Sequence, residues 1–210
     1  KVNELERFPI KIEGSDNIKN CFTSNVKKII SNKNKLKRLD DFKFNEIYSK
    51  YSSKNGLNLK DIIEISNFKN KLYSGRARKI RNFTVNINTN IITIYLDKSS
   101  SGKYEVLKFE ENDKNKRKYI KYYLENLTDE QLNEIDNKYS GNLLKKTLQI
   151  EIPDYNKDHV VKKVVKEWEN LQQEINDLEK EIEKIDNEID QMVYKLYNLT
   201  KKEIEIIDNN

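Results

Sequence analysis

The feature that most constrains the fold is a stripe of apolar residues near the C-terminus, in a segment without Pro or Gly. The stripe alternates intervals of three and four residues: Val161, Val164, Trp168, Leu171, Ile175, Leu178, Ile182, Ile185, Ile189, Met192 and Leu196. This spacing is typical of a helix that packs along another helix. It predicts one helix over about residues 158–197, roughly 60 Å long. Either a second copy in a homodimer or another part of this chain would satisfy the stripe.

The residues after the stripe predict a stop and a second, shorter helix. Asn198 can adopt the left-handed conformation that ends helices. Thr200 and Glu203 have the spacing of a capping box, and Leu199 and Ile204 have the spacing of a hydrophobic staple. We therefore expect a short terminal helix over residues 201–207.

The middle of the chain mixes strand and helix signals. Alternating apolar residues predict two strands joined by a turn at residues 83–87 and 92–96, and a third strand carrying Tyr104, Val106 and Phe109. Helical spacing follows at residues 116–127, and a capping box at residues 128–131 begins a helix to about Lys138. Leu148, Ile150 and Ile152 then alternate in a short strand that Pro153 would stop.

The expected fold class is α+β. A small mixed or antiparallel sheet body with short helices precedes a long coiled-coil-like helix and a short terminal helix. We divide the chain into a basic N-terminal segment (residues 1–56), a recognition body (residues 57–156) and the two C-terminal helices (residues 157–210). Within the first part, short apolar faces are expected around Ile29 and around Phe42 and Phe44.

Composition restricts the class of protein. Hydrophobic residues make up 36% of the chain and charged residues another 36%, which still allows a core. No apolar run approaches the roughly 20 residues that a bilayer crossing needs, and the N-terminus lacks the apolar region of a signal peptide. We expect a cytoplasmic protein. Because the first residue is Lys and the only Met is Met192, we also expect a longer parent polypeptide.

Catalytic motifs are weak. The single Cys (Cys21) and the single His (His159) exclude an internal disulfide, a thiolate zinc cluster and a polyhistidine metal site. There is no glycine-rich phosphate loop and no methyl-donor pocket motif. Pro153 and Asp154 suggest a metal-dependent nuclease, but no strand-borne Glu-x-Lys follows them. We therefore predict no catalytic residue and no metal in this chain, with nuclease activity as the least favoured alternative.

The charge distribution points to a polyanionic partner. Residues 157–210 have a net charge of −5, whereas residues 1–156 have a net charge of +10. Three Arg and one Lys lie within residues 76–81, in what we call the basic segment (residues 73–82), and a second basic run begins at Lys114. Such side chains bind phosphates, and Arg also reads guanine. The predicted DNA-binding residues are Tyr73, Arg76, Arg78, Lys79, Arg81, Asn82, Lys114, Arg117, Lys145 and Lys146. The alternative is a solubilising surface in a Lys-rich composition.

Residues 181–207 resemble the C-terminal signature of specificity-bearing N6-adenine DNA methyltransferases of restriction–modification systems. In that family a long helix ends in Asp-x-x-Val-Tyr-x-Leu-Tyr-Gly-Leu-Thr, followed by acidic residues and Ile. The matching residues here are Asp190, Val193, Tyr194, Leu196, Tyr197, Leu199, Thr200, Glu203 and Ile204, with Asn198 in place of Gly. Residues 57–66 resemble the opening strand of such target-recognition domains. Residues 139–153 resemble the segment that leads into their long helix, which Type I specificity subunits share.

The resemblance covers about residues 57–210 and implies a specificity domain, with the fused Type IIG kind of enzyme as one option for the parent. The parent enzyme would transfer a methyl group from S-adenosylmethionine to adenine N6 in duplex DNA. The family's Asn-Pro-Pro-Tyr motif is absent, as expected if the methyltransferase domain lies N-terminal to this chain. The alternative function is a coiled-coil module that docks a partner subunit without contacting DNA.

Overall fold

The computed structural model describes residues 16–40, 44–51 and 55–208. The chain divides into two compact units, a helical unit (residues 1–41 and 172–210) and a mixed unit (residues 42–171). Helix α8 (Asp158–Leu196) contributes its first turns to the mixed unit and its remainder to the helical unit. The units therefore do not coincide with divisions at residues 56 and 156. Among the described residues, no helix combines the length and apolar character needed to cross a bilayer.

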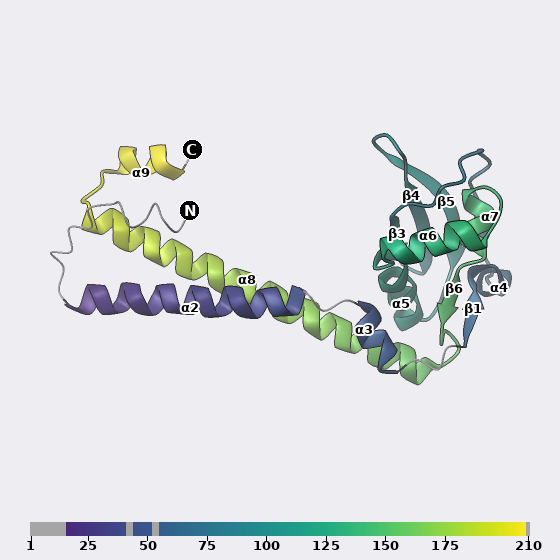
Figure 1. The fold of residues 1–210 in the computed structure, drawn as a ribbon, viewed down its shortest axis with the longest axis horizontal. Coiled ribbons are helices and arrows are strands. Elements are labelled where there is room, and N and C mark those ends of the chain that lie inside the picture. The colour runs from purple at the N-terminus through teal and green to yellow at the C-terminus, as the bar shows by residue number, and fades with distance from the viewer. Residues whose placement is uncertain (1–15, 41–43, 52–54, 209–210) are drawn as a thin grey trace. The chain divides into compact units, whose positions relative to one another are not determined.

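A four-stranded antiparallel sheet forms the centre of the mixed unit (Figure 1). Its order is β2 (Lys69–Lys71), β5 (Lys103–Glu110), β4 (Ile91–Asp97) and β3 (Phe83–Asn88). The predicted alternation holds in β3 and β4, where Phe83 and Val85 are buried, as are Ile92, Ile94 and Leu96. Apolar side chains on alternate positions face the same side of a strand, so these two strands cover one core.

Strand β5 departs from strict alternation because it contains a β-bulge. Ile94 pairs with Leu107 and Tyr95 pairs with Glu105, which leaves Val106 as the extra residue. At the bulge two consecutive residues, Val106 and Leu107, are both fully buried, and Phe109 is buried two positions further on. On the other side of β5, next to β2, the backbone N–H groups of Leu72 and Tyr73 donate to the Val106 carbonyl oxygen at 3.1 and 3.3 Å.

Short helices complete the core of the mixed unit. Helix α5 (Lys114–Glu125) packs on β3, and α6 (Asp129–Lys138) begins with the predicted capping box of Thr128 and Gln131. Helix α3 (Phe44–Ser49) buries Phe44 completely. The Phe44 ring meets Trp168 of α8 edge-on, with ring centroids 5.4 Å apart. Such aromatic contacts add to the burial energy of the rings.

Two predicted strands are mostly helical in the structure. Residues 57–66 begin with β1 (Gly56–Asn58) and continue as α4 (Leu59–Glu64), because Leu59, Ile62 and Ile63 have helical spacing and are all buried. Leu148 ends α7 (Leu143–Leu148), so the strand over residues 148–152 was wrong in its first half. Only β6 (Glu151–Pro153) is extended, and it pairs antiparallel with β1.

The helical unit contains α2 (Asp16–Asp40), the second half of α8 and α9 (Lys201–Asp208). Helix α2 runs antiparallel to α8, as Figure 1 shows. Asn25 Nδ2 donates to Glu188 at 3.4 Å, and Lys35 Nζ lies 2.7 Å from Glu174. The short apolar face expected around Ile29 belongs to this 25-residue helix, and the Ile29 side chain is buried. Phe42, in the second apolar face expected, lies outside the described residues.

The long stripe is covered by protein, as predicted. Every stripe residue from Val161 to Leu196 is buried or half-buried. In the helical unit, α2 covers the stripe, and the two helices carry opposite net charges. Residues 16–40 have a net charge of +5, and residues 172–196 have a net charge of −5. An intrachain helix therefore packs against this part of the stripe.

The end of α8 also follows the prediction. Asn198 has φ 50°, in the left-handed region. Thr200 and Glu203 form the capping box of α9, since the Glu203 carboxylate accepts the Thr200 N–H at 2.7 Å and Thr200 Oγ1 accepts the Glu203 N–H at 3.4 Å. The backbone hydrogen bond from Thr200, followed by the bond from its hydroxyl, lowers the pKa of Glu203. The fold as a whole is α+β, as expected.

Candidate nucleic-acid interface

The basic segment connects the edge strand β2 to β3. It has no regular secondary structure, yet its residues differ sharply in exposure. The side chain of Ile80 is buried and that of Ala77 half-buried, whereas the polar positions face solvent. The exposed residues are Arg76, Arg78, Lys79, Arg81 and Asn82. The segment thus presents its cations on the surface while two apolar side chains attach it to the core.

Hydrogen bonds hold the first half of the segment. The Tyr73 hydroxyl accepts the Ala77 N–H at 2.8 Å, which closes a tight loop. The Ala77 carbonyl accepts the Leu143 N–H at 3.0 Å, and the Asn142 side chain donates to the Gly75 carbonyl at 3.1 Å. Asn142 also caps α7, accepting the Lys145 N–H. The start of α7 therefore fixes the backbone that carries Arg76 and Arg78.

A buried ion pair holds the second half. Both carboxylate oxygens of Asp136 accept the Ile80 N–H, at 3.0 and 3.2 Å. The Lys146 ammonium donates to the same carboxylate at 2.8 Å and also to the backbone carbonyl of Asp136. Lys146 is only 6% exposed. The structure therefore gives Lys146 a supporting role beneath the segment, in contrast to the surface role expected for it.

Gly75 is required by the segment's own packing. A Cβ atom at this position would lie 2.5 Å from the Tyr73 hydroxyl oxygen. The Tyr73 ring in turn packs edge-on against Tyr104, with centroids 5.2 Å apart. The absence of a Cβ atom at Gly75 therefore lets the Tyr73 hydroxyl lie close to the backbone of the segment. Tyr73 is correspondingly half-buried and acts as an anchor.

The side chains of the four cations of the segment face solvent. Within the described parts of the chain, Arg76, Arg78, Lys79 and Arg81 make no hydrogen bond or ion pair through their side chains. Several other cations of the mixed unit are paired: Lys116 with Asp158, Lys118 with Glu169, Lys121 with Glu125 and Lys157 with Asp154. Unpaired cations on an anchored backbone are suited to bind an external anion.

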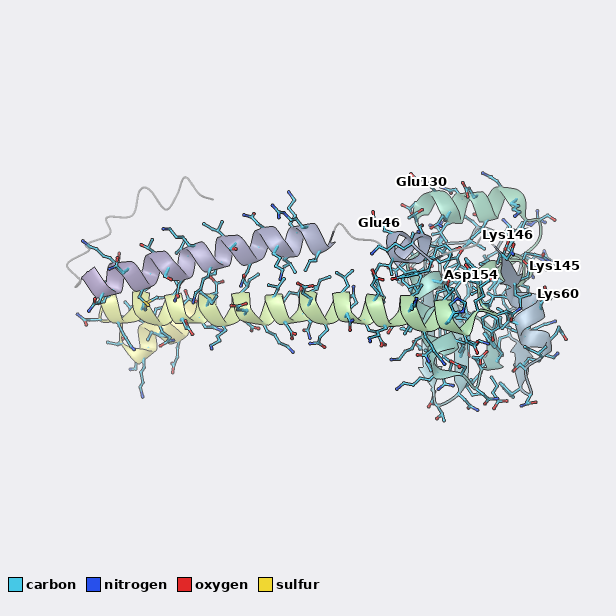
Figure 2. The ribbon with its side chains drawn as sticks, turned by 90° about the horizontal axis from the view of Figure 1, so that it is seen from below. Glu46, Lys60, Glu130, Lys145, Lys146 and Asp154 are labelled. Carbon is cyan, nitrogen blue, oxygen red and sulfur yellow. The ribbon has the colours of Figure 1, made fainter. Side chains whose placement is uncertain are left out.

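Lys145 extends this surface onto α7. Its side chain is exposed, next to the buried Lys146 on the same helix. Helix α7 packs on α4, which carries the exposed Lys60; these lysines are labelled in Figure 2. Lys145 remains available to an anion, and Lys60 is a cation on a neighbouring helix that the sequence did not single out.

The second basic run lies on α5, the helix that packs on β3. Lys114 is exposed, while Arg117 Nη1 donates to the carbonyls of Glu111 and Asn112 at 2.6 and 2.8 Å. Lys118 and the Tyr122 hydroxyl both donate to Glu169. Burial opposes ionisation of Glu169, but these hydrogen bonds and the positive charge of Lys118 lower its pKa. Burial, and secondly the bond to Glu169, raises the pKa of Tyr122 to about 12.

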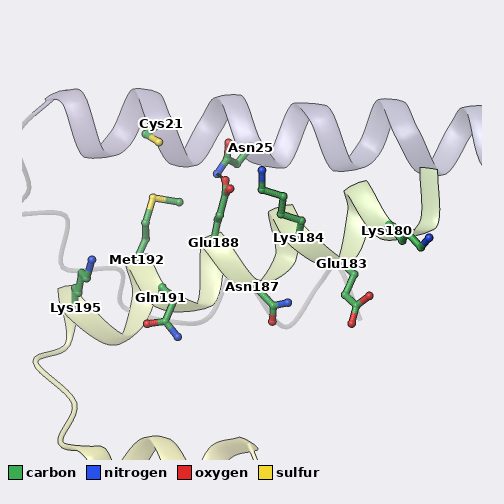
Figure 3. A pocket seen from close by; sticks show the side chains of 10 residues that line it. All are labelled: Cys21, Asn25, Lys180, Glu183, Lys184, Asn187, Glu188, Gln191, Met192 and Lys195. Atoms are coloured by element: carbon green, nitrogen blue, oxygen red, sulfur yellow. Dashed lines mark hydrogen bonds between the residues drawn. The ribbon is translucent and has the colours of Figure 1, made fainter. Parts of the chain in front are cut away.

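The helical unit has a hollow between α2 and α8 with a volume of about 680 Å³ (Figure 3). Short side chains on α2, Cys21 and Asn25, face longer ones on α8, including Met192. The lining mixes three lysines with two glutamates, so it selects neither anions nor cations. His159 lies in the first turn of α8, and no three His, Cys, Asp or Glu residues gather as metal ligands in the described ranges.

Sequence reasoning located the exposed cations but missed the residues that position them. Asn142 carries a local signal, because it precedes a helical turn as an N-cap. Asp136 carries no such signal: it is one acidic residue among several on α6. Its contact with Ile80 joins residues 56 positions apart, which only the tertiary structure reveals.

No protein-family model, curated protein or solved structure matches this chain.

Proposed function

We propose that this chain binds duplex DNA and that the basic segment reads its sequence. The observation that carries the proposal is a set of four cations, Arg76, Arg78, Lys79 and Arg81, that have no ion-pair partner among the described residues and stand on a backbone fixed by α6 and α7. Phosphate contacts position a protein on DNA, whereas contacts to base edges specify the site. A fixed backbone favours base reading because it limits the conformational entropy lost when side chains enter a groove.

The two kinds of cation have different roles in this proposal. Arg76 and Arg78 flank the small residue Ala77, which leaves room for a groove to approach, and a guanidinium can donate two hydrogen bonds to guanine O6 and N7. Lys79 and Lys145 supply point charges to phosphates. Arg81 and Asn82, where the segment enters β3, border the same surface.

The resemblance of residues 181–207 to adenine methyltransferases suggests the larger context. In this proposal the chain is the specificity part of an N6-adenine methyltransferase, with a separate methyltransferase domain as its partner. That domain would bind S-adenosylmethionine and receive the flipped adenine. The residues of this chain would select the site and hold the duplex.

The test is DNA binding by the 210-residue chain, measured by fluorescence anisotropy over a range of salt concentrations. Preferred sites are first selected from a pool of random duplexes. Arg76→Gln, Arg78→Gln and Lys79→Gln are compared with Lys166→Gln, an exposed lysine of α8 with no ion pair to a described residue. The control removes the same charge from the same unit outside the segment.

We expect Lys79→Gln to weaken all duplexes alike and to flatten the salt dependence by about one unit. We expect Arg76→Gln or Arg78→Gln to cost about 1–3 kcal/mol on the selected site and to relax preference there. Unchanged affinity and preference in all three variants would overturn the proposal.

The same measurements address the alternative assembly function. If the chain only docks a partner subunit, Arg76→Gln, Arg78→Gln and Lys79→Gln should change DNA affinity no more than Lys166→Gln does, because all four remove one positive charge. Such a module would also select no site from the pool. Sedimentation velocity of the chain then determines whether the helical unit forms a homodimer. A dimer that forms without salt-dependent DNA binding would favour the assembly function.

A further inference from the structure

We propose that the groove between β3 and α5 is a second binding site for the phosphate backbone of the same duplex. The inference rests on the proposed DNA binding but concerns different residues. The groove has a volume of about 630 Å³. Its lining comes from β3 and the following turn on one side and from α5 on the other: Val85, Asn86, Ile87, Thr89, Lys114, Arg117, Lys118, Lys121 and Tyr122.

The charge of the lining selects an anion. Lys114, Arg117, Lys118 and Lys121 follow one another at intervals of three, one and three residues, so they form one continuous stripe of α5. No Asp or Glu is among the described residues that line the groove. Glu125 and Glu169 bind Lys121 and Lys118 but do not line the groove themselves.

Two of the four cations are available to a ligand. Lys114 is exposed and makes no hydrogen bond or ion pair within the described ranges. Arg117 is held through Nη1 alone by the Glu111 and Asn112 carbonyls, which fixes its guanidinium and leaves Nη2 and Nε without a described partner. The N-terminus of α5 is already capped by the Asp113 carboxylate, which accepts the Asn115 and Lys116 N–H groups. The capacity for an anion therefore rests on Lys114 and Arg117 themselves.

The edge of β3 argues against an added peptide strand as the occupant. The Val85 N–H donates to Glu125 Oε1 at 2.8 Å, and the Val85 carbonyl accepts the Lys121 ammonium at 2.7 Å. These side chains occupy the backbone groups that a further strand would need, which is a common protection of edge strands. A phosphodiester needs only donors and positive charge, and the groove supplies both.

The spacing of the two sites fits duplex DNA. From Asn82 at the end of the basic segment to Ile87 in the groove, β3 extends for five residues. At about 3.3 Å per residue this is roughly 17 Å. Successive phosphates of one strand advance about 3.4 Å along the axis, so about five base-pair steps separate the two contacts. A duplex of one helical turn can reach both sites, and a much shorter one cannot.

The experiment compares hairpin-closed duplexes of 4 and 14 base pairs binding to the 210-residue chain across salt concentrations. The variant is Lys114→Gln, with Lys114→Arg to restore the charge and Lys166→Gln as the matched control. We expect Lys114→Gln to flatten the salt dependence by about one unit on the long duplex. We expect little change on the short duplex, and wild-type behaviour in Lys114→Arg and Lys166→Gln.

The outcomes separate this inference from the proposed function. If Arg76→Gln and Arg78→Gln weaken binding while Lys114→Gln leaves the long-duplex salt dependence unchanged, the groove is not a phosphate site and the basic segment still is. If the wild-type chain binds no duplex, both fail. A labelled oligoglutamate peptide is the counter-probe: saturable binding lost in Lys114→Gln, with DNA binding intact, would assign the groove to an acidic peptide.

Discussion

The Lys146 ammonium lies 2.8 Å from a carboxylate oxygen of Asp136, and the Lys146 side chain is 7% and the Asp136 side chain 15% exposed. The carboxylate also accepts the backbone N–H of Ile80. One buried ion pair therefore joins α6, α7 and the basic segment. Removing one member leaves the other charge buried without a partner, which costs far more than losing an exposed pair.

We expect Lys146→Met to lower the free energy of unfolding by about 3–5 kcal/mol. Lys145→Met is the matched control, because it removes the neighbouring, exposed lysine of the same helix, and we expect a change within about 0.5 kcal/mol. Urea unfolding measures both. Hydrogen exchange of the Ile80 amide should accelerate in Lys146→Met alone; equal effects of the two variants would contradict the assigned role.

Gly75→Ala should destabilise the mixed unit by about 1–3 kcal/mol, because the added methyl group overlaps the Tyr73 hydroxyl. In a Tyr73→Leu background the overlap is absent, so the same substitution should cost markedly less. The four unfolding free energies form a double-mutant cycle. Additive effects would show that Gly75 and Tyr73 do not contact each other.

The N-cap of α5 should make stability sensitive to acid. Burial opposes ionisation of Asp113, but the backbone N–H groups of Lys116 and Asn115 donate to it and lower its pKa. A carboxyl with a lowered folded-state pKa contributes stability above its unfolded pKa of about 3.9, and the contribution disappears as pH falls through the folded value. Asp113→Asn keeps a capping oxygen but should lose this acid dependence.

Asp113→Ala removes the cap itself and should cost about 0.5–2 kcal/mol at neutral pH. Thermal unfolding between pH 2 and 7 compares the three proteins. Identical pH profiles of wild type and Asp113→Asn would refute the electrostatic part of the prediction. A neutral effect of Asp113→Ala at pH 7 would refute the capping part.

Asn198→Ala should destabilise the end of α8 by about 1 kcal/mol, since a left-handed conformation is costly for a residue with a Cβ. Asn198→Gly should be neutral or stabilising, because Gly adopts φ 50° without that cost. Helix content and unfolding of the two variants, measured by circular dichroism, provide the comparison. The opposite ranking would show that the Asn198 side chain, and not its backbone, matters.

Where the physical cause is local, the sequence alone was sufficient to predict the structure. The three-four spacing from Val161 to Leu196 predicted the long helix, and Thr128 and Gln131 predicted the capping box. Both patterns depend on residues within one or two helical turns of each other. The exposed cations of the basic segment were equally visible, since Arg and Lys remain in solvent unless a partner repays their desolvation.

The tertiary structure decided what depends on distant residues. Residues 57–66 could have continued as a strand; packing of Leu59, Ile62 and Ile63 against the core made most of them a helix. Lys145 and Lys146 are adjacent and chemically alike, yet only Lys146 is buried, because Asp136 lies ten positions away across a turn. Burial and pairing are properties of the folded chain, and they distinguish a supporting cation from one that is available to DNA.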